Sequence, residues 1–203
     1  MATGNLPPIE EPQAYSGLLP AIWQTWAAAC FRPREFFSSV GNNQALTPAL
    51  LFGVGCVWIG LFIVSLWVAM LPPYPGEYEQ VQLVINVVRM CCCGWIYPLI
   101  GVFLGGLLLH LFLALFGGAN RGLTTTLRVV AYAQAPALFS IVPILGSCVG
   151  SVWGLVLCII GLAAAHRTET WRAVLAVFVP CVLCIGIGII AGGFLYYVYH
   201  PPS

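Results

Sequence analysis

Long apolar stretches alternate with short charged segments along most of the chain. Asp, Glu, Lys and Arg are absent from four runs, which cover residues 36–76, 90–120, 129–166 and 173–203. Crossing a bilayer core of about 30 Å takes ~20 helical residues. The first, second and fourth runs therefore each predict one membrane span, and we expect these spans at about 47–71, 91–116 and 173–197.

The third run, from Val129 to His166, is too long for one crossing. As a single helix it would extend over about 57 Å, at ~1.5 Å per residue. Pro143 and Gly146 lie inside it, and these residue types favour a turn between two helices. We therefore predict two antiparallel spans, at about 124–142 and 145–165, and five spans in all.

The positions of the arginines test this count independently. If the chain has five spans and a cytoplasmic N-terminus, only Arg89 lies outside. The other arginines then lie on the cytoplasmic side, and they are Arg32, Arg34, Arg121, Arg128, Arg167 and Arg172. An excess of basic residues on that side is the usual rule for membrane proteins. With the third run taken as one span the bias would weaken, so the sequence favours five spans and an external C-terminus.

Two further segments precede the first predicted span. Residues 1–17 are rich in proline and are expected to form a disordered tail. Residues 18–40 repeat apolar side chains at helical spacing and end in phenylalanines beside Arg32 and Arg34, which predicts an amphipathic helix. Such a helix is expected to lie in the cytoplasmic headgroup layer. The alternative is a helix docked against the underside of the bundle.

The overall composition indicates the class of protein. Only 6% of the 203 residues are charged and 61% are hydrophobic, whereas roughly 25% of residues are charged in an ordinary soluble domain. A soluble surface cannot be built from so few charges, so we predict an all-α polytopic membrane protein embedded in the lipid bilayer. The formal net charge of +1 gives no general attraction to nucleic acid, and no nucleic-acid partner is expected.

Several short motifs follow one another in a recognisable order. They are PREFF at 33–37, LFGG at 115–118, TTTLRVV at 124–130, AYAQAP at 131–136 and PILG at 143–146. Their order resembles the Yip-domain family of five-span membrane proteins, which is named for eukaryotic members that interact with Ypt/Rab GTPases. The resemblance covers about residues 20–195.

The resemblance implies an all-helical bundle with a cytoplasmic N-terminus, and it implies no particular reaction. Eukaryotic relatives are linked to vesicle trafficking and membrane organisation. The part of this chain before the first predicted span is only about 46 residues long, which departs from the eukaryotic pattern. The resemblance is therefore to the prokaryotic branch, and it implies a protein of the plasma (inner) membrane.

Ionisable residues inside predicted spans are costly and are candidates for function. His110 lies about two turns from the cytoplasmic end of the second span, and Arg128 lies about one turn inside the third. Arg121, Arg167 and Arg172 lie on the same side of the membrane. We predict that these five residues form a basic pocket for an anionic phospholipid headgroup. The alternative is that Arg128 snorkels to the interface and the others only set the topology.

A second group of candidate residues lies near the middle of the third span. Tyr132 and Gln134 are polar, and Pro136 should kink the helix because it frees the carbonyl group of Tyr132. Together with Pro143, these residues either line a ligand cavity or only shape the bundle.

The fourth span carries Gly146, Gly150 and Gly154 at a spacing of four residues. Such a stripe lets helix backbones approach closely. We expect it to face its own bundle, and the alternative is that it faces another protomer.

Nine cysteines raise the question of redox or metal chemistry. Cys91, Cys92 and Cys93 point to different helix faces and cannot share one tetrahedral site. Cys181 and Cys184 have redox spacing, but they lie in an apolar helix without polar neighbours for a thiolate. We expect the cysteines to pack as small apolar residues, with a disulfide or a metal site as the alternative. No cofactor is predicted.

Sequence signatures of catalysis are absent, since the chain has no HExxH, GxSxG, P-loop or Rossmann motif and no aspartate. The sequence therefore favours a non-enzymatic protein that organises membrane or protein partners, or that forms homo-oligomers. The alternative is lipid or small-molecule transport, with the spans' polar residues facing a pathway. An enzyme that uses His166 beside Glu169 is the third hypothesis.

Overall fold

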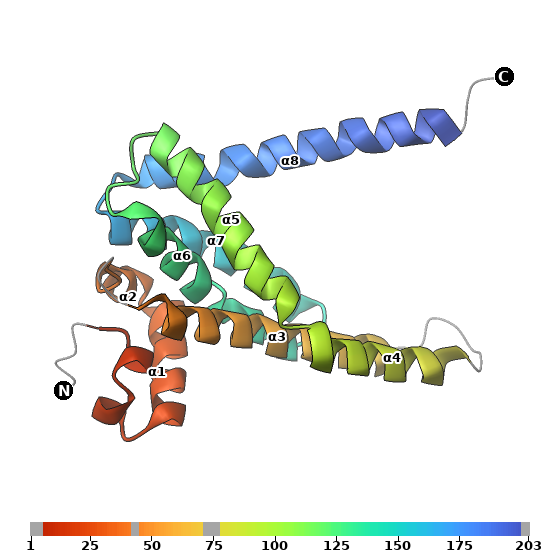
Figure 1. The fold of residues 1–203 in the computed structure, drawn as a ribbon, viewed down its shortest axis with the longest axis horizontal. Coiled ribbons are helices and arrows are strands. Elements are labelled where there is room, and N and C mark those ends of the chain that lie inside the picture. Colours follow the sequence, from red (N-terminus) through yellow and green to blue (C-terminus); the bar gives the residue numbers. More distant parts are fainter. Residues whose placement is uncertain (1–5, 42–44, 71–77, 200–203) are drawn as a thin grey trace.

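The computed structural model describes residues 6–41, 45–70 and 78–199. Within these ranges the regular structure is entirely helical (Figure 1). Four helices in the described part are long and apolar enough to cross a membrane. They are α3 (Leu46–Met70), α5 (Ile96–Leu115), α7 (Leu145–His166) and α8 (Thr170–Tyr199). The predicted all-α polytopic class is confirmed.

The second predicted span differs from the helix that the structure contains. We expected a span at about 91–116, whereas α4 (Tyr78–Cys93) ends just inside this range and α5 begins after a break at Gly94 and Trp95. Pro98 explains the break, because its ring has no N–H to donate and clashes with the carbonyl group four residues earlier. That carbonyl belongs to Gly94.

The third predicted span is not one helix from 124 to 142, and this expectation was wrong. The segment divides into α6 (Gly122–Tyr132) and the 3-10 helix η3 (Ala135–Ile141). Pro136 is the cause, since it removes the hydrogen bond to Tyr132, and the kink predicted there becomes a change of helix type. The two pieces together extend about 30 Å, so this pass is as long as a bilayer core is thick. The number of membrane crossings stays a prediction.

The turn predicted at Pro143 is confirmed. Ile144 has φ 60° and ψ −65°, and α7 begins at the next residue. The reversal places α7 antiparallel to the α6–η3 segment. Figure 1 shows the helices that follow one another along the chain, from α3 through α5, α6 and α7 to α8; the segment η3 connects α6 to α7.

The glycines of α7 face η3. A Cβ atom at Gly146 would collide with the carbonyl group of Phe139, and one at Gly150 would lie 2.6 Å from the carbonyl oxygen of Pro136. Gly154, one turn further on, has room for a Cβ at ordinary contact distance. The predicted stripe therefore faces its own bundle, and its two tightest positions allow η3 to pack directly on α7.

The N-terminal segment is ordered where the structure describes it. We expected residues 1–17 to be disordered, but from residue 6 onward they contain the 3-10 helices η1 (Pro8–Glu10) and η2 (Pro12–Tyr15). Residues 1–5 lie outside the described part. Tertiary contacts are the reason for the order, because η1 packs against α1 and α3.

The predicted amphipathic helix over 18–40 consists of α1 (Leu18–Phe31) and α2 (Pro33–Ser38), which are separated at Arg32. One side docks on the bundle: the indole of Trp26 donates to the carbonyl of Ala135 at 3.0 Å, and Phe37 is completely buried. The docked alternative is thus what the structure contains. The other side of α1 is apolar and open, with Leu19 79% and Trp23 65% exposed.

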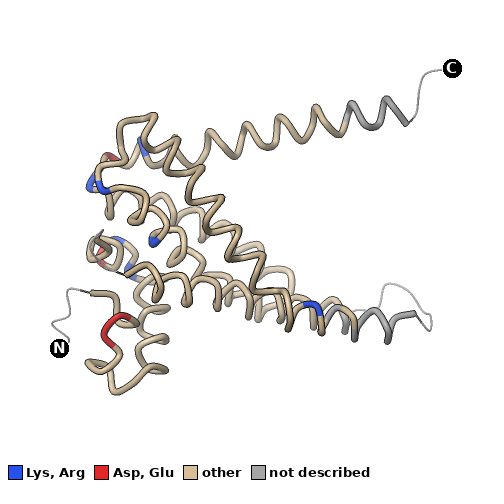
Figure 2. Tube along the Cα trace, viewed as in Figure 1, with Lys and Arg blue, Asp and Glu red and all other residues tan. Residues whose placement is uncertain are grey.

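Charged residues gather at one end of the bundle (Figure 2). The connection between α5 and α6, the connection between α7 and α8, and the N-terminal helices all lie there. At the other extreme, the second half of α8 projects away from the remaining helices, and Ile189 and Ile190 are more than two-thirds exposed. The molecule thus has a polar, densely packed end and an apolar, open end.

Candidate functional site

Helix α6 concentrates buried polar side chains on two opposite faces. Arg128 and Tyr132 are four residues apart and share one face, whereas Thr126 is two residues from Arg128. Two residues correspond to a rotation of about 200° around an α-helix, so Thr126 points the other way. All three side chains are fully buried.

On the first face, Arg128 is held by two groups from distant parts of the chain. Its Nη2 donates to Oε1 of Glu10, with which it forms an ion pair, and its Nη1 donates to the carbonyl oxygen of Ala45 at 2.7 Å. The hydroxyl of Tyr132 donates to the same Glu10 oxygen at 2.7 Å. The Nε of Arg128 is buried and has no hydrogen-bond partner among the described residues.

The surroundings of this ion pair are apolar. The rings of Phe36 and Phe52 pack against Tyr132, with centroids 5.1 and 5.6 Å from that of the tyrosine. A buried arginine without an anion would be strongly unfavourable, so the carboxylate of Glu10 is what permits Arg128 to lie here. The N-terminal segment delivers it, and the N–H of Ile9 anchors that segment by donating to Oγ1 of Thr25 at 2.9 Å.

On the second face, Thr126 links two histidines from different spans. Its Oγ1 lies 2.8 Å from Nδ1 of His110 on α5 and 2.9 Å from Nε2 of His166 at the end of α7. The backbone N–H of Arg121 donates to Nδ1 of His166 at 3.2 Å. Because Nδ1 of His166 accepts, its Nε2 carries the proton and donates to Thr126. The threonine hydroxyl then donates to His110, and both rings are neutral.

The remaining predicted basic residues lie in the connections between helices. Arg172 donates from Nη1 to the carbonyl of Gly117 at 2.6 Å and pairs through Nε with Glu169 at 3.2 Å. Arg167 is exposed and ends α7 in a left-handed conformation. Arg121 is half-buried at the start of α6.

The predicted basic pocket is therefore not assembled as one site. Arg128 lies on one face of α6, and His110 belongs to the chain of hydrogen bonds through Thr126 on the other face, which we call the histidine chain. Arg121, Arg167 and Arg172 lie in the connections between helices. The reason is the rotation of α6, which turns Arg128 away from Thr126 and hence away from the histidine that Thr126 contacts. In addition, the guanidinium group of Arg128 is buried and already forms an ion pair with Glu10, so in this structure it is not exposed to a lipid headgroup.

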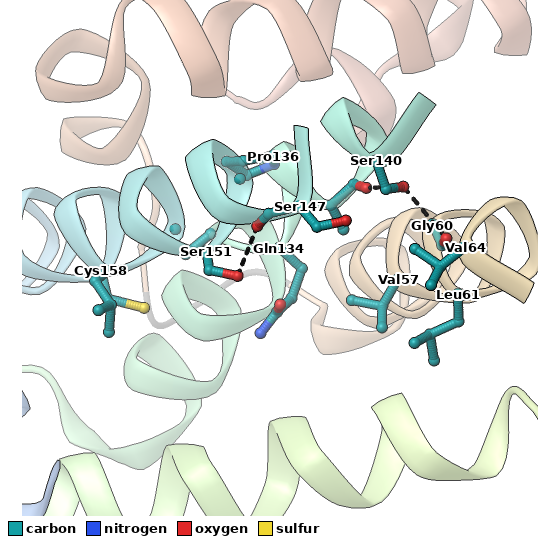
Figure 3. Close-up of a pocket in the computed structure, with 15 residues that line it drawn as sticks. Val57, Gly60, Leu61, Val64, Gln134, Pro136, Ser140, Ser147, Ser151 and Cys158 are labelled. Carbon is teal, nitrogen blue, oxygen red and sulfur yellow. Dashed lines mark hydrogen bonds between the residues drawn. The ribbon is translucent and has the colours of Figure 1, made fainter. Parts of the chain in front are cut away.

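A groove lies between α3, η3 and α7, with a volume of about 470 Å³ (Figure 3). Most of its lining is apolar or small, as with Val57, Leu155 and Gly154. Gln134 extends into it, and its side-chain amide has no hydrogen-bond partner among the described residues. Of the four residues considered for a cavity in the third span, Gln134 and Pro136 line this groove, whereas Tyr132 belongs to the Arg128 face and Pro143 lies outside the lining.

The cysteines offer no assembled metal site in the described part of the chain. No group of three or more His, Cys, Asp or Glu side chains there could hold a metal ion. Cys30, on α1, is buried, and burial raises the pKa of its thiol to about 12. A thiol that stays protonated is a poor nucleophile, so Cys30 acts as a packing residue.

Sequence reasoning missed Glu10 and Thr126. Glu10 was assigned to a disordered tail, and Thr126 was treated only as part of a motif. One signal was available for Glu10: the chain has only six carboxylates, and an arginine inside a span requires one of them. No comparable signal singles out Thr126, because neighbouring threonines have the same chemistry.

Comparison with known proteins places this architecture in a family. A model of the Yip1 domain matches residues 17–192, which include every helix from α3 to α7. No curated protein and no solved structure matches the chain. Because the match covers most of the sequence, the chain belongs to the Yip1 domain family and is an integral membrane protein.

Proposed function

We propose that this protein organises partners within the membrane and carries out no chemical reaction, and that a partner's transmembrane helix packs in the groove between α3, η3 and α7. The observation that carries the proposal is the amide of Gln134, which has no partner within the described residues and lies in an apolar groove of about 470 Å³. An amide at this depth is satisfied by a hydrogen bond to another helix. The small side chains of Ser147 and Ser151 in the lining allow a helix backbone to come close.

The side chains that line the groove are mostly apolar, which favours an apolar occupant. Val57, Leu61 and Val64 line it from α3, and Leu155 and Cys158 line it from α7. Ser140 and Ser151 contribute little polarity of their own, because their hydroxyls donate to backbone carbonyl oxygens of the same helix at 2.7 and 2.8 Å. A transmembrane helix matches these walls, whereas a hydrophilic segment would lose its hydration.

Crosslinking in the membrane tests this proposal. A photoreactive amino acid at Leu155, in the groove, should yield an adduct of discrete, protein-sized mass. The same residue at Ile189, which is 71% exposed on α8, should yield only lipid adducts. Ser151→Phe, which fills the groove, should remove the protein adduct. Identical adducts at both positions would overturn the proposal.

A second candidate function is lipid binding in the same groove. It is favoured by the predominantly apolar lining, which also suits an acyl chain, while Gln134 would bond to an ester carbonyl. The same experiment distinguishes the two functions. A lipid-sized adduct that forms at Leu155, disappears with Ser151→Phe and is absent at Ile189 would support lipid binding.

We further propose that the N-terminus is cytoplasmic, that the C-terminus is external and that the membrane is a prokaryotic plasma membrane. The gathering of arginines at one end of the bundle supports this orientation, because basic residues accumulate on the cytoplasmic side (Figure 2). An enzyme reporter that is active only outside the cytoplasm should be active when fused after Ser203. An inactive reporter would contradict the orientation or the count of five spans.

A further inference from the structure

We propose that Arg128 and Tyr132 form an anion-binding site which the chain's own Glu10 closes, and that a phosphate group displaces Glu10 from it. Glu10 then acts as a built-in competitor carried on the N-terminal segment. The site lies outside the groove, whose lining includes neither Arg128 nor Tyr132, so its failure would leave the proposed function untouched.

Glu10 leaves one donor of the site without an acceptor in the described part of the chain. Nη2 of Arg128 and the hydroxyl of Tyr132 converge on one carboxylate oxygen, while Nε of Arg128 is buried without an acceptor in the described chain. A buried N–H that lacks a partner is unfavourable. A phosphate presents several oxygens around one centre, so it can accept from Nε, Nη2 and the tyrosine hydroxyl together. The three donors fit a phosphate better than they fit this carboxylate.

The segment that carries Glu10 consists of short helices that can move away from the bundle. It consists of η1 and η2, which have only three and four residues. Short 3-10 turns have little stability of their own. Besides the contacts of Glu10, the hydrogen bond from Ile9 to Thr25 and the packing of the Ile9 side chain against the core hold η1 in place. Opening the site moves this segment of short 3-10 helices and leaves the long helices in place.

The position of the site is compatible with two sources of phosphate. The N-terminal helices lie at the charged end of the bundle, where a lipid headgroup or a soluble phosphate would be found (Figure 2). Both sources offer the same chemistry to Arg128. Experiments with an anionic phospholipid and with inorganic phosphate separate them.

Glu10→Gln is the main test, with Glu11→Gln as a matched control. Glu11 is the adjacent carboxylate, and its side chain contacts none of the groups of the site. The full-length protein is placed in nanodiscs of phosphatidylcholine with or without phosphatidylglycerol, and bound lipid is counted by native mass spectrometry. Binding of inorganic phosphate is measured by equilibrium dialysis.

Loss of the internal competitor should strengthen binding of one of the two probes at least about tenfold in Glu10→Gln. Glu11→Gln should bind like the wild type, and adding Arg128→Gln to Glu10→Gln should abolish the gain. Tighter phosphatidylglycerol binding identifies a lipid site, and tighter phosphate binding alone identifies a soluble ligand. If Glu10→Gln is folded and binds neither probe more tightly, the proposal is overturned.

The wild type provides a test that does not depend on the folding of any variant. Hydrogen exchange of residues 6–17 is followed in nanodiscs with each probe. Displacement of Glu10 should raise exchange in this segment at least about threefold, because its backbone loses the native contacts. Exchange in α6 should not rise. Unchanged exchange of residues 6–17 with both probes at saturating concentration would overturn the proposal.

Discussion

The two polar clusters on opposite faces of α6 are stabilised in different ways. The Arg128 face is charged and takes its counter-ion from a residue 118 positions away, and one of its donors has no acceptor in the part of the chain that the structure describes. The Thr126 face is neutral, and in it each hydrogen atom of the chain from Arg121 to His110 has an acceptor. One face is an ion pair with an unsatisfied donor, and the other is a complete chain of hydrogen bonds.

The difference shows which of the two clusters can open. Glu10 belongs to a segment of short 3-10 helices, so the ion pair separates when that segment moves. His110 and His166 belong to α5 and α7, so the histidine chain separates only if two spans move apart. Satisfied buried networks rigidify a core, whereas an imperfectly satisfied one marks a place where the structure can change. We therefore assign a structural role to the Thr126 face and a binding role to the Arg128 face.

The largest effect is expected from removing the negative charge of the ion pair. Glu10→Gln leaves Arg128 charged and buried, and it should lower the free energy of unfolding in a neutral detergent by about 3–5 kcal/mol. Denaturant titration of the purified protein measures this loss. Glu11→Gln is the control and should stay within ~0.5 kcal/mol of the wild type.

Removing both charges sharpens this test. Glu10→Gln combined with Arg128→Met eliminates the buried charge and should recover most of the lost stability, because a neutral pair needs no counter-ion. If Glu10→Gln alone costs no more than Glu11→Gln, the ion pair does not stabilise the fold and the comparison of the two faces fails.

A smaller effect is expected on the opposite face. Thr126→Val keeps the shape of the side chain but leaves the Nε2 hydrogen of His166 and Nδ1 of His110 without partners. The expected loss in free energy of unfolding is about 2 kcal/mol. Thr124→Val, at an exposed position on the same helix, is the matched control. Equal stability of the two variants would show that the histidine chain does not hold α5 and α7 together.

The smallest effect is expected from Tyr132→Phe, which removes one of the two donors to Glu10. Because Arg128 still neutralises the carboxylate, the expected loss is about 1 kcal/mol. A double-mutant cycle measures the coupling, since the same substitution should cost close to nothing when Glu10→Gln is already present. A full additional loss in that background would mean that the tyrosine hydroxyl stabilises the fold through another contact.

Much of the fold could be predicted from local sequence. The ends of α3 and α7 follow from long uncharged runs and from the turn at Pro143. The kink at Pro136 was also predictable, since a proline affects the carbonyl group four residues earlier in any helix. The predictions of one continuous helix at 91–116 and of one at 124–142 were wrong because of two prolines. Pro98 divides α5 from α4, and Pro136 converts the second part of the third pass to a 3-10 helix.

The candidate site was predictable only in part. Arg128 and Tyr132 stood out because ionisable and polar residues are rare in spans. The grouping of Arg128 with His110 was wrong, because it used depth in the membrane and ignored rotation around α6. Assigning the proline-rich start of the chain to disorder also hid Glu10, whose segment is held in place by tertiary contacts.

The sequence by itself determined that this protein lies in a membrane, where most of its long helices run and that an arginine lies inside one of the predicted spans. These properties depend on hydrophobicity and proline geometry over a few turns of helix, which local sequence contains. Only the tertiary structure decided that Glu10 neutralises Arg128 and that Thr126 joins two histidines. Those partners are far apart in sequence, and many pairings satisfy the same charges and hydrogen bonds until packing brings one set of atoms within reach.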